Sequence, residues 1–106
     1  MASHYAWVIT QDLDNPYDED TELGLPTRVG VAGPASATAE DIRRALTEGA
    51  FFRLLDDDGN PYYIGRCWSI DGPASQDMFG PLDDYGRVDI GATEIQYRIH
   101  GDWQGL

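Results

Sequence analysis

The segment HYAWVITQDL, residues 4–13, carries apolar side chains on both sides of an extended chain. Side chains of a strand alternate between two faces. Here Tyr5, Trp7 and Ile9 share one face, and Ala6 and Val8 share the other. Because a strand that is apolar on both faces is typically covered on both, the segment predicts a strand near the centre of a sheet.

The segment ATAEDIRRALTEGA, residues 37–50, predicts the one helix of the chain. Thr38 is a suitable N-cap, Asp41 fits the electropositive first turn, and Gly49 is a suitable end. Its apolar stripe is narrow and consists of Ile42, Ala45, Leu46 and Gly49. A short helix of this kind is stable when it packs on a sheet.

The segment RLLDDDGNPYYIGR, residues 53–66, places three aspartates and a glycine between two apolar runs. A turn at 57–59 with Gly59 in the left-handed conformation sets Asp56 opposite Asn60. Counting outward, Leu54 then faces Tyr62, and Leu55 faces Pro61. Arg53 faces Tyr63 in the same register, so Tyr63 is predicted to lie on the outer face of the sheet.

A calcium-binding loop beginning at Asp56 would need glycine at its sixth position and glutamate at its twelfth. Those positions hold Pro61 and Cys67. The aspartates therefore predict a turn and not a metal site.

Two further strands are predicted over 27–33, where Val29 and Val31 share a face, and over 93–100, which alternates cleanly. The segment 70–91 is rich in Gly and Pro and lacks periodicity, which predicts a long connection pinned by Met78, Phe79, Leu82 and Tyr85. The sequence thus predicts a single α+β domain over residues 1–106. It consists of an antiparallel sheet of about five strands with one short helix on one face.

The charge balance bears most strongly on function. Nineteen Asp and Glu face seven Arg and no Lys, for a formal net charge of −12. Such a field repels bare phosphate and attracts a basic protein, although it is also explained by solubility alone. The residues predicted to contact a basic partner are Asp12, Asp14, Asp18, Glu19, Asp20, Glu22, Tyr63, Asp83 and Asp84.

Catalytic and metal-binding signatures are absent from the sequence. Cys67 and His100 are the one conceivable nucleophile and base, but no cysteine-enzyme motif surrounds Cys67. The acids of the 12–20 segment follow no ligand-loop pattern, and His4 is expected to face solvent. We therefore expect no catalytic residue, no metal and no cofactor.

The expected compartment is the cytoplasm. Cys67 is the single cysteine, so an internal disulfide is excluded. No apolar run reaches membrane-spanning length, and no charged-then-apolar leader opens the sequence.

Four segments carry a resemblance: HYAWVIT, LLDDDGNPYYIGR, PLDDYG, and GATEIQYR followed by Trp103. Together they resemble small acidic uncharacterised proteins of high-GC bacteria and their phages and plasmids. The resemblance implies a mobile-element setting and assigns no activity to any residue.

The sequence predicts a non-enzymatic acidic interaction module that docks on a basic protein, such as one that binds nucleic acid. Two alternatives stay open: a small Cys/His-dependent enzyme, and a structural protein that self-associates through the Tyr63 face.

Overall fold

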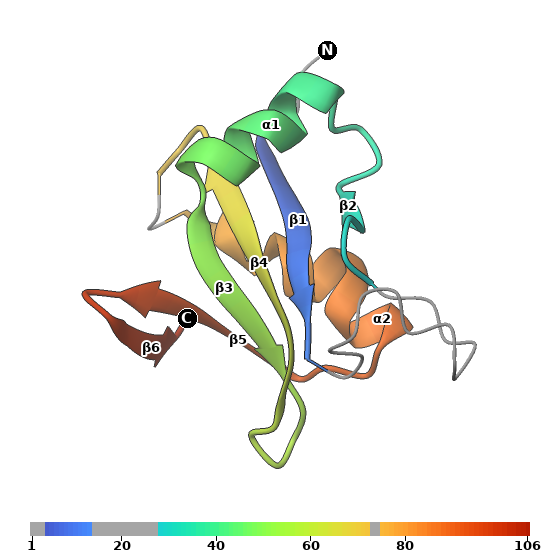
Figure 1. Ribbon diagram of the computed structural model, residues 1–106, viewed down its shortest axis with the longest axis vertical. Coiled ribbons are helices and arrows are strands. Elements are labelled where there is room, and N and C mark those ends of the chain that lie inside the picture. The colour runs from blue at the N-terminus through green and yellow to red at the C-terminus, as the bar shows by residue number, and fades with distance from the viewer. Residues whose placement is uncertain (1–3, 14–27, 73–74) are drawn as a thin grey trace.

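The computed structural model describes residues 4–13, 28–72 and 75–106. They form one antiparallel sheet with the strand order β2-β1-β4-β3-β5-β6 (Figure 1). The strands are β1 (Tyr5–Asp12), β2 (Ala32–Gly33), β3 (Ala50–Leu55), β4 (Pro61–Ser69), β5 (Glu94–Ile99) and β6 (Asp102–Gly105). The α+β class is confirmed, with six strands where about five were predicted.

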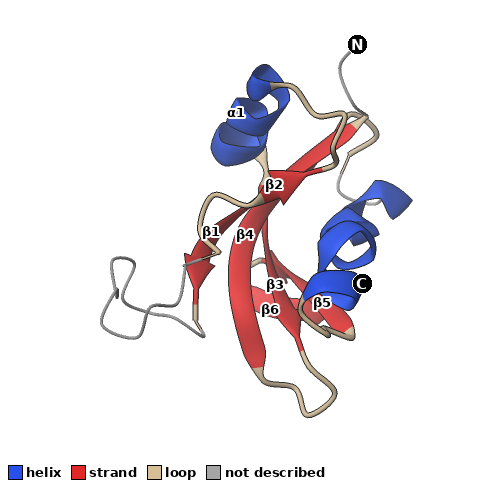
Figure 2. Cartoon of the chain, turned by 90° about the vertical axis from the view of Figure 1, so that its right-hand side faces the viewer, coloured by secondary structure: helices blue, strands red, loops and turns tan. Residues whose placement is uncertain are grey.

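Helices lie on both faces of the sheet (Figure 2). Helix α1 (Ala39–Glu48) covers one end of one face. The opposite face carries a bent helix, made of a 3₁₀ turn, a π-helical turn and a last short turn of α-helix. These are η1 (Gln76–Phe79), η2 (Leu82–Gly86) and α2 (Arg87–Asp89).

The bent helix corrects the prediction of an irregular connection over 70–91. Glycine and proline inside the segment obscured its helical period. Gly80 lies against the Tyr5 ring, where a Cβ atom would collide, so close packing explains this glycine. The predicted pins Met78, Leu82 and Tyr85 are indeed buried.

Both faces of β1 are covered, as predicted. Trp7 and Ile9 belong to the larger core, between the sheet and the bent helix. Ala6 and Val8 pack with Ala45 of α1 in a smaller cluster. The strand is therefore held between two layers.

Helix α1 begins and ends where the sequence predicts. The Thr38 hydroxyl accepts a hydrogen bond from the Asp41 backbone N–H, and the Asp41 carboxylate accepts one from the Thr38 N–H. Gly49 is the C-cap. The predicted apolar stripe is only partly right, because Leu46 is 43% exposed while Asp41 and Ala45 are buried.

The aspartate segment is a turn, as predicted. Gly59 has φ +81°, and Asp56 accepts hydrogen bonds from the backbone N–H groups of Asp58 and Asn60, at 2.9 Å each. A third comes from the Tyr62 hydroxyl, at 2.8 Å. The Asp56 carboxylate thus stabilises the turn to which it belongs.

The predicted register beyond this turn is wrong by one residue. Leu55 pairs with Pro61 as expected, but an irregularity follows, and Leu54 pairs with Tyr63 instead of Tyr62. A shift of one residue moves a side chain to the opposite face of a sheet. Tyr63 is consequently in the larger core and only 6% exposed.

Both edges of the sheet differ from the prediction: one edge strand is shorter than predicted, and the other, β6, was not predicted. The 27–33 strand is reduced to the two residues of β2, and Val29 is exposed. At the other end, β6 pairs with β5, and Trp103 lies opposite Arg98. In the described ranges, every helix is too short or too polar to span a lipid bilayer.

Candidate functional site

The predicted acidic loop is represented in the structure by Asp12 alone. Asp14, Asp18, Glu19, Asp20 and Glu22 lie outside the described residues. Asp12 is 3% exposed, and its Oδ2 accepts a hydrogen bond of 2.8 Å from the Arg28 backbone N–H. The prediction of a surface carboxylate at Asp12 is therefore wrong, because this group holds the chain at Arg28.

Tyr63 is also misplaced by the sequence reasoning. Its burial removes it from the outer patch that was predicted with Arg53, Leu55 and Pro61. Because Tyr63 is buried, it cannot provide the surface that the alternative of self-association requires.

Asp83 and Asp84 are both exposed on η2, but their surroundings differ. Asp83 forms a loose pair with Arg87 of the same helical segment, at 3.7 Å. Asp84 Oδ2 accepts two hydrogen bonds from β1, from the Tyr5 hydroxyl at 2.7 Å and from Trp7 Nε1 at 3.1 Å. The Asp84 carboxylate is therefore held by the sheet, whereas that of Asp83 is not.

The alternation of β1 explains why two donors converge on Asp84. Tyr5 and Trp7 are two positions apart and so face the bent helix together. Burial and then the bond to Asp84 raise the pKa of the Tyr5 hydroxyl, so it stays a donor at neutral pH.

Asp84 lines a groove of about 340 Å³, which we name the Asp84 groove. Its remaining walls are Trp7, Val31, Ala32, Gly33, Pro34, Ala35 and Tyr85. The Trp7 and Tyr85 rings lie 5.7 Å apart, centroid to centroid. At Gly33 a Cβ atom would collide with the Trp7 indole, so glycine lets the β2 backbone approach that ring. An apolar wall that ends at a fixed carboxylate suits an alkyl chain that ends in a cation.

Arginines neutralise few of the carboxylates in the described ranges. Arg44 pairs with Glu48 at 3.9 Å and Arg87 with Asp83 at 3.7 Å, both on solvent-exposed helical surface. Other guanidinium groups lie over aromatic rings, with Arg53 over Trp103 and Arg66 over Phe51. In the described ranges, arginine side chains are thus engaged with aromatic rings as well as with carboxylates.

Cys67 and His100 do not form an activated pair. Cys67 is fully buried beside Met78, and burial raises the pKa of its thiol to about 12. A cavity of about 340 Å³ has Cys67 among its lining residues, but a protonated thiol is a poor nucleophile. His100 is exposed in the turn between β5 and β6.

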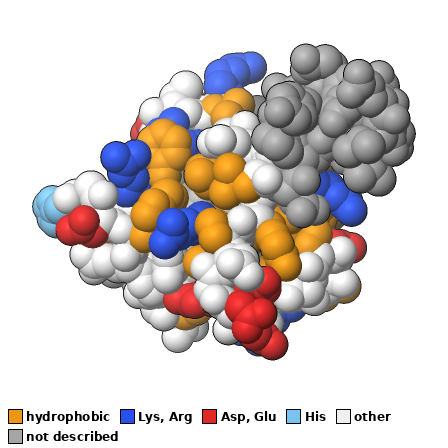
Figure 3. Space-filling model, turned by 60° about the horizontal axis from the view of Figure 1, so that its bottom comes forward, with side chains coloured by type: hydrophobic (Ala, Val, Ile, Leu, Met, Phe, Trp, Pro, Cys, Tyr) orange, Lys and Arg blue, Asp and Glu red, His pale blue; other side chains and the backbone are white. Residues whose placement is uncertain are grey.

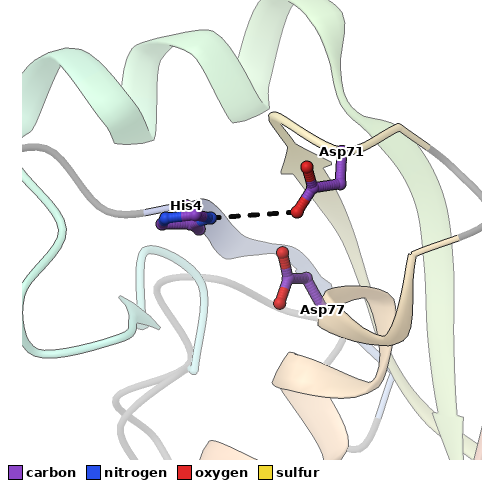
Figure 4. A group of neighbouring side chains, drawn as sticks. All are labelled: His4, Asp71 and Asp77. Carbon is purple, nitrogen blue, oxygen red and sulfur yellow. Dashed lines mark ion pairs between the residues drawn. The ribbon is translucent and has the colours of Figure 1, made fainter.

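A second group of polar side chains joins the start of β1 to the segment after β4 (Figure 4). His4, Asp71 and Asp77 each offer one ligand atom, and these atoms lie within 4.8 Å of one another. Ser69 orients the acids, since its hydroxyl donates to Asp77 Oδ2 and accepts from the Asp71 N–H. A mixed nitrogen and oxygen set of this kind suits a transition metal.

This trio is an open arrangement. The side chains of His4 and Asp71 are 77% and 62% exposed, and the pair is 3.8 Å apart. Structural zinc sites have four protein ligands, whereas the described residues supply three here. Water would compete for every position, so this geometry fits a weak chelating surface.

Sequence reasoning found Asp84 by its charge and missed its partners. Tyr5 and Trp7 were interpreted only as core, although buried Tyr and Trp need acceptors for their polar groups. That requirement indicates that some acceptor exists but not which one. The trio was missed because it depends on β1 pairing with β4, where Tyr5 lies opposite Ser69.

Comparison with protein-family models, with curated proteins and with solved structures finds no match for this chain.

Proposed function

We propose that this protein is a non-enzymatic interaction module that docks on a basic protein and receives one of its Lys or Arg side chains in the Asp84 groove. The observation that carries the proposal is the Asp84 carboxylate, which is fixed by Tyr5 and Trp7 yet exposed. A carboxylate held in advance loses little conformational freedom when a cation binds.

The groove complements a basic side chain in two ways. Trp7 and the 31–35 backbone offer apolar surface to its methylene chain, and Asp84 offers a charge-assisted hydrogen bond to its end. The net charge of −12 adds a long-range attraction that raises the rate of encounter with basic proteins. The groove thus orients the bound side chain, and the net negative charge attracts the basic protein.

Two features of the sequence support a setting for this role. The single free cysteine is buried and favours the reducing cytoplasm. The resemblance to small proteins of high-GC bacteria and their phages and plasmids favours a partner encoded by, or met by, a mobile element.

The test measures binding of a short fluorescent lysine- and arginine-rich peptide by anisotropy, at low and at moderate salt. We expect Asp84→Asn to weaken binding about tenfold, since a hydrogen bond to a charged group contributes roughly 1.5–3 kcal/mol. Asparagine is nearly isosteric and still accepts from Tyr5 and Trp7. Asp83→Asn is the matched control: it makes the same change in net charge one residue away and should weaken binding less than about twofold.

Two outcomes would contradict the proposal. Equal losses in Asp83→Asn and Asp84→Asn would mean that only the overall charge attracts the peptide. Absence of salt-sensitive binding by the unaltered protein would remove the docking function itself. The indole N–H resonance of Trp7 reports whether the variant keeps the local fold.

A further inference from the structure

We propose that the sheet face next to α1 is a second docking surface, which binds an acidic peptide segment of another protein. This proposal goes beyond the first because it concerns the opposite side of the sheet and the opposite sign of charge. We name this surface the arginine face and define it by Phe51, Arg53, Ile64, Arg66, Arg98 and Trp103.

The register of the strands assembles the arginine face. Phe51 pairs with Arg66 across β3 and β4, and Arg98 pairs with Trp103 across β5 and β6. Arg53 pairs with Gln96 across β3 and β5, and Arg98 lies two positions beyond Gln96 on the same face of β5. Two pairs of a cation and a ring thus share this face, one on β3 and β4 and one on β5 and β6.

This surface is only partly covered. Helix α1 packs over Ala6, Val8 and Trp68, at the β1 and β4 end of the sheet. Phe51 is 42% exposed, and Arg98 is exposed. Figure 3 looks from below and partly onto this face, and there blue arginine and orange apolar side chains are interspersed.

The arginines of this face have no carboxylate partner among the described residues, although the chain is strongly acidic. Ion pairs in those ranges involve Arg44 and Arg87, not Arg53, Arg66 or Arg98. The carboxylate of Glu94, on the same side of β5, accepts a hydrogen bond from Gln96 Nε2 at its Oε2. Guanidinium groups that share a face and have no carboxylate partner in the described ranges favour an anionic ligand.

Two of these guanidinium groups are held in place. Arg66 lies 4.2 Å from the centre of the Phe51 ring and donates from Nε to the Gly49 carbonyl. Arg53 lies 4.6 Å from the centre of the Trp103 ring and donates from Nε to Gln96 Oε1. With Nε occupied, each presents its two terminal nitrogens, the pair that binds a carboxylate in bidentate fashion.

The geometry favours a peptide over a single-stranded nucleic acid. Nucleic-acid platforms need ring faces open for stacking bases, but here a guanidinium covers one face of each ring. A net charge of −12 also repels a chain of phosphates far more than a segment with a few carboxylates. Phe51 and Ile64 offer apolar contact to the peptide between its acids.

The experiment titrates the full protein with a short labelled peptide that carries glutamates among leucines. A second peptide with glutamine in place of glutamate and an oligothymidylate strand are titrated in parallel. We expect Arg98→Gln to weaken binding of the glutamate peptide about tenfold. Arg43→Gln, the same change on the exposed outer side of α1, should leave affinity unchanged.

The affinities of the two peptides and of oligothymidylate, measured for the unaltered protein and the variants, test the proposal. Binding of the glutamate peptide that depends on Arg98 but not on Arg43, together with no binding of the glutamine peptide, supports it. Equal losses in both variants, no binding at all, or tighter binding of oligothymidylate would overturn it. Asp84→Asn should bind the glutamate peptide like the unaltered protein, so failure of this proposal is distinguishable from failure of the first.

Discussion

The two faces of the sheet are built from alternate residues of the same strands, but they are covered to different extents. Among the described residues, the core between the sheet and the bent helix contains twelve buried residues, whereas the cluster between the sheet and α1 contains three. Phe51 and Phe52 are neighbours in β3, yet Phe51 is 42% exposed and Phe52 is 0% exposed. Apolar character alone therefore does not determine burial, since what packs on each face decides it.

The sharpest test of this difference replaces each phenylalanine by alanine. Phe52→Ala should lower the free energy of unfolding by about 3–5 kcal/mol, because it removes a packed ring and leaves a cavity. Phe51→Ala should cost less than about 1 kcal/mol, since the ring is half in solvent and loses chiefly its contact with Arg66. Chemical denaturation of the two variants measures both values.

Similar losses in the two variants would contradict the comparison. That result would mean that the arginine face is packed against something in the free protein and is not available to a ligand.

The covered face also predicts an unreactive thiol. With the pKa of Cys67 raised to about 12 by burial, the thiolate fraction at neutral pH is roughly a thousandfold lower than that of free cysteine. Labelling of the native protein should be slower by at least about that factor, because the sulfur is also inaccessible.

Labelling in denaturant is the control, and it should proceed at the rate of free cysteine. A native rate as fast as that of free cysteine would show that the Cys67 thiol is accessible and ionised in the folded protein. It would also return the Cys67 enzyme to consideration.

Sequence reasoning succeeded where structure is local. The Thr38 cap of α1 and the turn at Gly59 depend on residues a few positions apart. The burial of β1 on both faces could be predicted because its own side chains are apolar on both faces. In each case the decisive interaction lies within the segment that was read.

Sequence reasoning failed where distant residues decide. The face on which Tyr63 lies depends on an irregularity in β-strand pairing at Leu54 and Leu55. The distinction between Asp83 and Asp84 depends on Tyr5 and Trp7, which are 79 and 77 residues away from Asp84. Charge alone identified both aspartates but could not tell which one the fold fixes.

The smallest expected effect concerns the turn that sets the register between the faces. Asp56 binds the Asn60 N–H and the hydroxyl of Tyr62, the residue at the irregularity. These hydrogen bonds, led by that of the Asn60 backbone and followed by that of Tyr62, lower the pKa of Asp56 below its ordinary value of 3.8. Asp56→Asn should lower Tm by roughly a few degrees at neutral pH, whereas Asp57→Asn, in the same turn, should not.

The pH dependence of this difference separates the carboxylate from a general effect of the turn. A group whose pKa is lowered by folding stabilises the protein above its unfolded pKa, and that stabilisation is lost as the pH falls through the folded pKa. The Tm gap between the unaltered protein and Asp56→Asn should therefore be constant above about pH 5. It should close only in more acidic solution, as Asp56 itself becomes protonated. A gap that is the same at neutral and strongly acidic pH would show that the carboxylate charge plays no part, and that the turn is held by its backbone alone.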